Sequence, residues 1–118
     1  MPNTHCYYGR SSDVLRIILP KLSEEPVLFY LDANEYDDWS LLEELEVISR
    51  THKDNCVVVI DDCKVLIRSN VPFYSYKGEE LSLKYVQCAL NKIFSDYEVV
   101  YLVPKNPNHR AKLVAKPR

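Results

Sequence analysis

Three runs of apolar residues divide the chain, and none of them alternates with polar residues. They cover 27–31, 56–60 and 99–103 and are rich in β-branched and aromatic side chains. Unbroken runs of this length are typical of strands that are covered on both faces, as in a parallel sheet. Weaker strands are expected at 5–8 and at 112–116, where a preceding turn rich in proline and asparagine favours a terminal hairpin.

Amphipathic helical patterns fill the gaps between these strands. The first helix is expected to begin near Ser11 or Ser12, with one of these serines as its N-cap, and to be bent or shortened by Pro20. The second carries the spacing of a capping box at Ser40 and Glu43, in which hydroxyl and carboxylate satisfy each other's backbone donors.

A third helix is expected to begin within 79–82, after one long loop over 66–77. Each helix carries an apolar stripe spaced for one buried face. The members of the stripes are Val14, Leu15, Ile18, Leu19 and Leu22, then Leu41, Leu42, Leu45 and Ile48, then Val86, Ala89, Leu90, Ile93 and Tyr97.

The order of these elements predicts an α/β fold in a single domain over 1–118. It should hold about five strands, mostly parallel with a C-terminal antiparallel hairpin, and three helices on one face of the sheet. The opposite face would then be apolar and without helices of its own. We therefore expect a homo-oligomer, a dimer through this helix-free face, because so large an apolar surface is unusual on a monomer.

Composition excludes several classes of protein. Only two glycines, Gly9 and Gly78, are present, so the 118 residues contain no glycine-rich loop that could cradle a dinucleotide or phosphate. The net charge is −2 with both signs interspersed, which argues against nucleic acid as a partner.

No apolar run approaches the roughly 20 residues that span a bilayer, and no signal segment is evident, so the sequence predicts a cytoplasmic protein without membrane contact. The cysteines are too far apart for a zinc knuckle or a redox pair and are expected as reduced core thiols at Cys6, Cys56, Cys63 and Cys88.

Acidic residues follow two of the predicted strands. Asp32 comes after the first apolar run, and Asp61 and Asp62 come after the second. If these strands are neighbours, their ends lie about 4.8 Å apart, and the three carboxylates could share Mg²⁺ or another hard cation. Aspartates after strands also form ordinary turns and helix caps, so both interpretations stay open.

Other candidate residues for chemistry are few. Lys64 follows the acidic pair and could act as a base if it is buried. The three histidines stand apart from any nucleophile motif. Trp39 and the aromatic residues within 72–76 could line a pocket for a small-molecule ligand, or they could pack the core.

Three segments of the chain resemble class I S-adenosylmethionine-dependent methyltransferases. They are 29–34 (FYLDAN), 39–45 (WSLLEEL) and 57–62 (VVVIDD), and the similarity runs from about residue 6 to the C-terminus. The resemblance implies the C-terminal half of a truncated Rossmann-like methyltransferase fold. The segment 8–15 is similar to a strand-to-helix junction of such enzymes, which makes Gly9 and Ser11 candidate cofactor contacts.

The resemblance also implies a metal site. In metal-assisted O-methyltransferases an aspartate and a following Asp-Asp pair bind a divalent cation that orients the acceptor hydroxyl, and the matching residues here are Asp32, Asp61 and Asp62. One departure is Asn34, where such enzymes commonly carry histidine.

The glycine-rich cofactor loop of the family would lie upstream of these segments. S-adenosylmethionine binding and methyl transfer are therefore not expected of the chain alone. Two functions stay open. One is a non-catalytic homo-oligomeric module of unknown ligand, and the other is a half-enzyme that methylates a small acceptor together with a partner chain.

Overall fold

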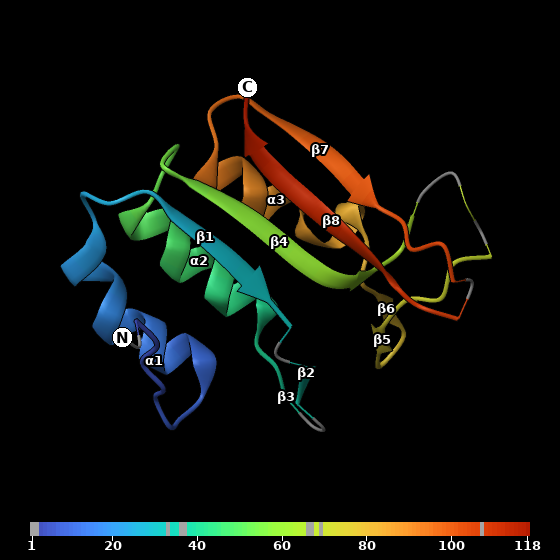
Figure 1. Ribbon diagram of the computed structural model, residues 1–118, viewed down its shortest axis with the longest axis horizontal. Helices are drawn as coiled ribbons and strands as arrows, with labels where there is room; N and C mark the ends of the chain where they lie inside the picture. The colour runs from blue at the N-terminus through green and yellow to red at the C-terminus, as the bar shows by residue number, and fades with distance from the viewer. Residues whose placement is uncertain (1–2, 33, 36–37, 66–67, 69, 107) are drawn as a thin grey trace.

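The computed structural model describes residues 3–118 except 33, 36–37, 66–67, 69 and 107 (Figure 1). Its elements are α1 (Ser11–Ile18), the 3₁₀ helix η1 (Leu19–Leu22), β1 (Val27–Leu31), β2 (Asn34–Glu35), β3 (Asp38–Trp39), α2 (Leu41–Thr51), β4 (Cys56–Cys63), β5 (Ser75–Tyr76), β6 (Glu79–Glu80), α3 (Leu83–Ile93), β7 (Tyr97–Leu102) and β8 (Ala111–Pro117). The expected α/β class and the three helical segments are confirmed.

The main sheet is mixed and has four strands in the order β1-β4-β8-β7. β1 pairs with β4 in parallel, whereas β8 is antiparallel to both of its neighbours. The expected terminal hairpin is therefore present as β7 and β8, with β8 lying between β7 and β4. Two short hairpins, β2 with β3 and β5 with β6, stand outside this sheet.

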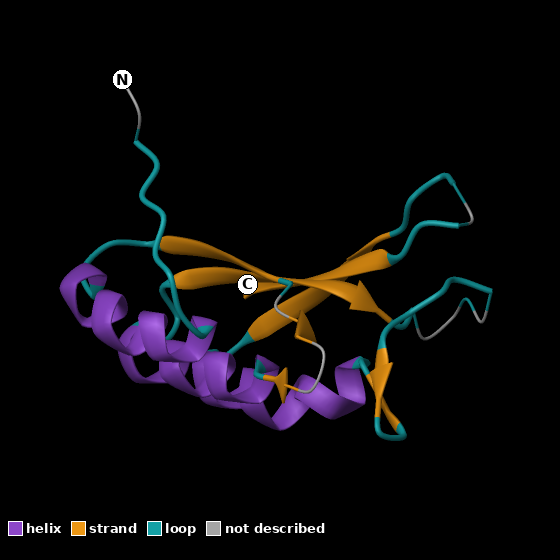
Figure 2. Cartoon of the chain, turned by 90° about the horizontal axis from the view of Figure 1, so that it is seen from below, coloured by secondary structure: helices purple, strands orange, loops and turns teal. Residues whose placement is uncertain are grey.

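All three α-helices lie on one face of the sheet, as Figure 2 shows with the sheet seen edge-on. α2 connects β1 with β4, and α3 connects β4 with the hairpin beyond it. Both connections step across the sheet in the same direction, which places their helices on the same side. The prediction of three helices on one face is confirmed, and the other face carries no helix among the described residues.

The hydrophobic core fills the layer between the helices and the sheet. Alternate residues of each strand point into it, because successive side chains of a strand face opposite sides. Its buried members from the strands and from α2 and α3 include Phe29, Leu31, Val58, Ile60, Leu113, Ala115, Leu45, Ile48, Val86, Leu90 and Ile93. The apolar stripes of α2 and α3 are thus largely confirmed, although Leu42 is exposed and Tyr97 belongs to β7.

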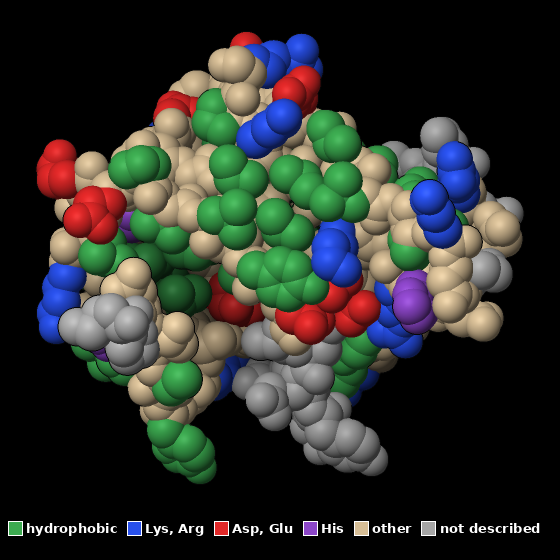
Figure 3. Space-filling view, in the orientation of Figure 1, with side chains coloured by type: hydrophobic (Ala, Val, Ile, Leu, Met, Phe, Trp, Pro, Cys, Tyr) green, Lys and Arg blue, Asp and Glu red, His purple; other side chains and the backbone are tan. Residues whose placement is uncertain are grey.

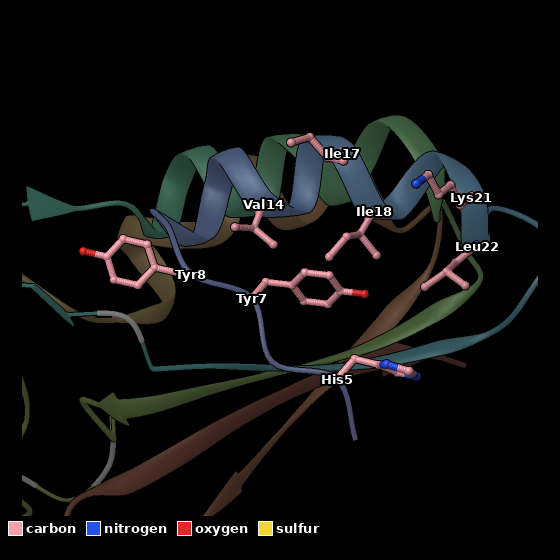
Figure 4. A pocket seen from close by; sticks show the side chains of 8 residues that line it. All are labelled: His5, Tyr7, Tyr8, Val14, Ile17, Ile18, Lys21 and Leu22. Carbon is pink, nitrogen blue, oxygen red and sulfur yellow. The ribbon is translucent and has the colours of Figure 1, made fainter. Parts of the chain in front are cut away.

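The prediction of a strand at 5–8 was wrong, so the sheet has four strands rather than about five. This segment has no strand partner, and Tyr7 and Tyr8 are exposed. The Tyr7 ring lies instead beside α1 (Figure 4), and β1 remains the edge of the sheet. The prediction that the sheet is mostly parallel was also wrong, because β8 makes two of the three pairings antiparallel.

The starts of the first two helices differ in detail from the prediction. Arg10, rather than Ser11 or Ser12, occupies the N-cap position of α1. Ser40 occupies the N-cap position of α2, but its side chain makes no capping hydrogen bond. Glu43 binds Arg10 in a salt bridge, and the Ser40 hydroxyl donates to Glu44. A tertiary ion pair between α1 and α2 has replaced the capping box. Pro20 lies in the 3₁₀ helix that ends α1, as expected for a residue that interrupts helical hydrogen bonding.

Candidate functional site

The three predicted acidic ligands lie together at the carboxyl ends of β1 and β4. Leu31 of β1 is paired with Ile60 of β4, so the residues that follow them are neighbours. One carboxylate oxygen from each of Asp32, Asp61 and Asp62 lies within 4.8 Å of the other two. The juxtaposition expected from the sequence is present.

A local irregularity of β4 allows the consecutive residues Asp61 and Asp62 both to lie near Asp32. In a regular strand Asp61 and Asp62 would point to opposite sides of the sheet. Here the pairing with β8 shifts register between Ile60 and Cys63, and Asp62 has a φ of 63°. That left-handed conformation is uncommon for residues other than glycine but is tolerated by aspartate. The Asp62 amide also donates to the Asp61 carboxylate at 2.8 Å, which holds the pair in place.

Basic and hydroxyl groups already contact this acidic cluster. Asp61 accepts hydrogen bonds from the Tyr30 hydroxyl at 2.5 Å and from Lys112 Nζ at 3.3 Å. Arg110 forms a salt bridge with Asp62 at 3.5 Å. The three carboxylates are therefore opposed by two cationic side chains, and most of the cluster's charge is balanced within the chain.

The two central carboxyl groups are shifted in opposite directions. Burial acts to raise the pKa of Asp61, but the hydrogen bonds from Tyr30, the Asp62 amide and Lys112 outweigh it and hold the pKa below its usual value. The pKa of Asp32 is raised, first by burial and then by the negative charges of Asp61 and Asp62. The fold therefore stabilises the ionised form of Asp61 and destabilises the ionised form of Asp32.

The geometry of the cluster fits a divalent cation. Carboxylate oxygens are the ligands of Mg²⁺ and Ca²⁺, and oxygens on opposite sides of such an ion lie about 4–5 Å apart. A bound ion would nevertheless have to share Asp61 with Lys112 and Asp62 with Arg110. The donor set is thus suitable, but competition with two lysine or arginine contacts should make binding weak.

The remaining sequence candidates serve contacts within the chain. Lys64 forms a salt bridge with Glu80 at 2.7 Å and lies 5.2 Å from the centre of the Phe73 ring. The Ser11 hydroxyl lies 3.2 Å from that of Ser40, between α1 and α2. Gly9 has a φ of 146°, which favours glycine at the entry to α1. None of these contacts assigns a catalytic or cofactor-binding role to the three residues.

The predicted aromatic residues pack on one another. The Trp39 ring is stacked on Tyr85 with centroids 4.3 Å apart, and it meets Tyr74 and Tyr76 edge-on at 5.4 and 6.3 Å. The cluster joins β3, the β5–β6 hairpin and α3. Of the two interpretations left open, this arrangement favours packing over a ligand pocket.

A groove that the sequence did not indicate lies between the N-terminal segment and α1. It has a volume of about 420 Å³. Figure 4 shows the Tyr7 ring lying below Val14 and Ile18, with Lys21 and His5 at the same end. This groove was not predicted because residues 5–8 were expected to form a strand. The apolar residues of α1 outside its predicted buried stripe were nevertheless a signal for it.

The helix-free face of the sheet carries a continuous set of apolar side chains. We call it the helix-free face patch, and it consists of Leu28, Tyr30, Val57, Val59, Val100, Leu102 and Val114. Leu28 is 65% exposed and Leu102 52%, in contrast to the buried residues on the helix side. Figure 3, which looks onto this face, shows hydrophobic side chains gathered over the strands with charged side chains around them.

The four cysteines are free thiols. Burial raises the pKa of Cys56 to about 11 and that of Cys63 to about 12, so both are unreactive core residues. Cys6 and Cys88 are exposed, so the prediction of core thiols was wrong for these two residues. Among the described residues no helix has the length and apolar character needed to cross a membrane. Comparison with models of known families, with curated proteins and with solved structures finds no match.

Proposed function

We propose that this chain is a methyltransferase-like module that forms homo-oligomers and does not catalyse methyl transfer by itself. The observation that carries the proposal is the exposed helix-free face patch. An apolar sheet face that folding leaves open is a surface for a partner, and the fold supplies that face without an obvious catalytic constellation. The ligand of such a module is a small molecule or a divalent cation at the acidic cluster, which lies at the carboxyl ends of two neighbouring parallel strands.

The extent of the patch sets the strength of association. Four strands spaced about 4.8 Å apart and six residues long cover roughly 400 Å². Apolar patches of this size on single chains are often functional. Two facing copies would bury at least about 800 Å², which is less than the roughly 1,200 Å² of stable complexes and belongs to weak, transient association. We therefore expect a reversible dimer with a dissociation constant of about 1–100 µM.

Sedimentation equilibrium over this concentration range tests the proposal. A mass that rises from monomer to dimer, with a melting temperature that increases with protein concentration, is the expected result. A well-folded monomer up to about 100 µM would contradict it, because the patch would then be tolerated in water.

A second candidate function rests on the open edge of β1. Among the described residues β1 pairs only with β4, and its five residues carry no charge or proline to block a further strand. The groove beside α1 lies next to the same edge. A partner chain that added a strand there would place its own strand end beside Asp32, where ligands bind in parallel sheets. In this alternative the chain is a half-enzyme for O-methylation of a small acceptor.

Cofactor binding by the chain alone is a further test of the proposed module. The 118 residues contain no glycine-rich loop, so we expect labelled S-adenosylmethionine to show no binding in equilibrium dialysis, with or without Mg²⁺. The melting temperature should likewise not change. Stoichiometric binding at micromolar concentration would show that the chain holds the cofactor without a partner chain, which contradicts the proposed module.

A further inference from the structure

We propose that two copies of the chain pack face to face about a two-fold axis that runs along the strands, between β4 and β8. Each Asp61 then lies opposite the partner's Lys112. The inference rests on the proposed homo-oligomer and goes further, because it fixes which strands and which side chains meet. It follows from the arrangement of charges on the helix-free face.

The side chains on this face form three rows across the sheet. The middle row is apolar throughout, since the strand register places Tyr30 beside Val59, Val59 beside Val114, and Val114 beside Val100. No charge interrupts it from one edge of the sheet to the other. Tyr30 and Val100, which are 50% and 40% exposed, are the members of this row that would lose contact with water in a dimer, whereas Val59 is already only 9% exposed.

The row toward the amino ends of β1 and β4 is mixed. It begins with Leu28 beside Val57, and the register then continues to Lys116 beside Glu98. Lys116 and Glu98 form a salt bridge at 3.4 Å. Apolar side chains thus occupy one half of this row and a neutral ion pair the other half.

The row toward the carboxyl ends carries its charges on the two central strands, β4 and β8. Asp61 of β4 pairs with Lys112 of β8 at 3.3 Å, and Leu102 of β7 lies beside Lys112. The negative group is on the β4 side of the sheet centre and the positive group on the β8 side. This order decides how a second copy can be placed.

Two sheets that meet through the same face can be related by an axis along the strands or by one across them. An axis across the strands exchanges the two outer rows. It would place Lys112 opposite the partner's Lys116 and Asp61 opposite the partner's Val57. Like charges would face each other at Lys112 and Lys116, which opposes association. A charge facing an apolar side chain does not distinguish the two axes, because the axis along the strands likewise places Glu98 opposite the partner's Leu28.

An axis along the strands keeps each row opposite itself and exchanges β1 with β7 and β4 with β8. Tyr30 then lies over the partner's Val100, and Val59 over the partner's Val114. Asp61 meets the partner's Lys112, so two acids and two bases alternate around the axis. Strands of the two sheets stay roughly aligned, which is the usual geometry of packed sheets.

Reversing the charge at Lys112 distinguishes the two arrangements, because the affinity of the dimer would change in opposite directions. With the axis along the strands, Lys112→Glu places like charges opposite each other and should weaken association by about tenfold. With the axis across the strands the same variant would face the partner's Lys116 and strengthen association, which would overturn the proposal. Circular dichroism establishes that the variant is folded, and the exchange Asp61→Lys with Lys112→Glu should restore the affinity.

Cysteine cross-linking gives a second test that does not depend on charge. Cys6 and Cys88, the exposed native thiols, are first replaced by serine. Tyr30→Cys and Val100→Cys are then oxidised separately and as a mixture. We expect covalent dimers only in the mixture, because like residues lie about three strand spacings, roughly 14 Å, apart across the axis.

The outcomes separate this inference from the proposed function. Self-linking of Tyr30→Cys alone would show an axis across the strands. A dimer in sedimentation that gives no cross-link in the mixture would contradict the arrangement and leave the homo-oligomer standing. A monomer in sedimentation would reject both.

Discussion

At the scale of single residues the acidic cluster is a balance between two aspartates. Asp61 accepts bonds from Tyr30 and Lys112, whereas Asp32 lies close to two other carboxylates. The first carboxyl group gains from the fold when it is ionised, and the second loses. Their opposite contributions make the cluster measurable without any ligand.

Asp32→Asn should raise the free energy of unfolding at neutral pH by about 0.5 kcal/mol. The pKa of Asp32 is raised above its usual value of 3.8, so the ionised form destabilises the fold as pH rises through the folded pKa. The gain should disappear below about pH 3.8, where the carboxyl group is protonated in both states. Urea unfolding at several pH values measures it.

Asp61→Asn is the matched variant and should have the opposite sign. The pKa of Asp61 is lowered, so its contribution is present above 3.8 and is lost as pH falls through the folded pKa. We expect a loss of about 1 kcal/mol at neutral pH. Equal effects of the two variants would contradict the assigned electrostatics.

Divalent cations should bind the acidic cluster weakly, with a dissociation constant of about 1 mM or higher, because Lys112 and Arg110 compete for the same oxygens. Calorimetry with Mg²⁺ and Ca²⁺ should show heat that Asp62→Asn removes. Asp96→Asn, at the opposite end of the sheet, should leave it unchanged. Equal and negligible heats for all three proteins would reject the site.

At the scale of elements the contacts between helices explain what the sequence could not predict. The spacing of Ser40 and Glu43 matched a capping box, but Glu43 binds Arg10 on α1, and local spacing carries no information about that partner. Residues 5–8 have strand-like composition, yet β-strands need a neighbour, and none of the described strands lies beside them. By contrast, the apolar runs that became β1, β4 and β7 and the stripes of α2 and α3 were predictable because burial itself fixes their periodicity.

The candidate site was also predictable only in part. Asp32 and the aspartates near the end of β4 were expected to meet because parallel neighbours end at the same edge of a sheet. Their partners Lys112 and Arg110 were not, since they come from β8 and the turn before it, about 50 residues further along the chain.

His52 is the side chain that most directly joins two elements. It is fully buried, its Nε2 lies 2.9 Å from the Leu22 carbonyl oxygen, and its ring meets Phe29 edge-on. His52→Ala should lower the free energy of unfolding by about 2–4 kcal/mol through the cavity and the lost hydrogen bond. Urea unfolding gives the value, and Lys53→Ala, at the exposed neighbour, should change it by less than about 0.5 kcal/mol.

At the scale of the whole molecule the fold is a half-covered sheet. Unbroken apolar strands were expected to be covered on both faces, and the helices cover only one (Figure 2). The apolar residues on the other face have the character of a core without its second layer. That difference between sequence pattern and single-chain structure is the reason to expect a second copy.

Sedimentation equilibrium of Val114→Lys beside Gln87→Lys tests this account most directly. Val114 lies in the middle row of the helix-free face, and a lysine there would have to be desolvated in the dimer. Gln87 is exposed on α3, so the same charge is added on the helix side. We predict that Val114→Lys stays monomeric up to about 100 µM while Gln87→Lys dimerises like the unmodified chain. Equal dimerisation of the two variants would show that the helix-free face is not the interface.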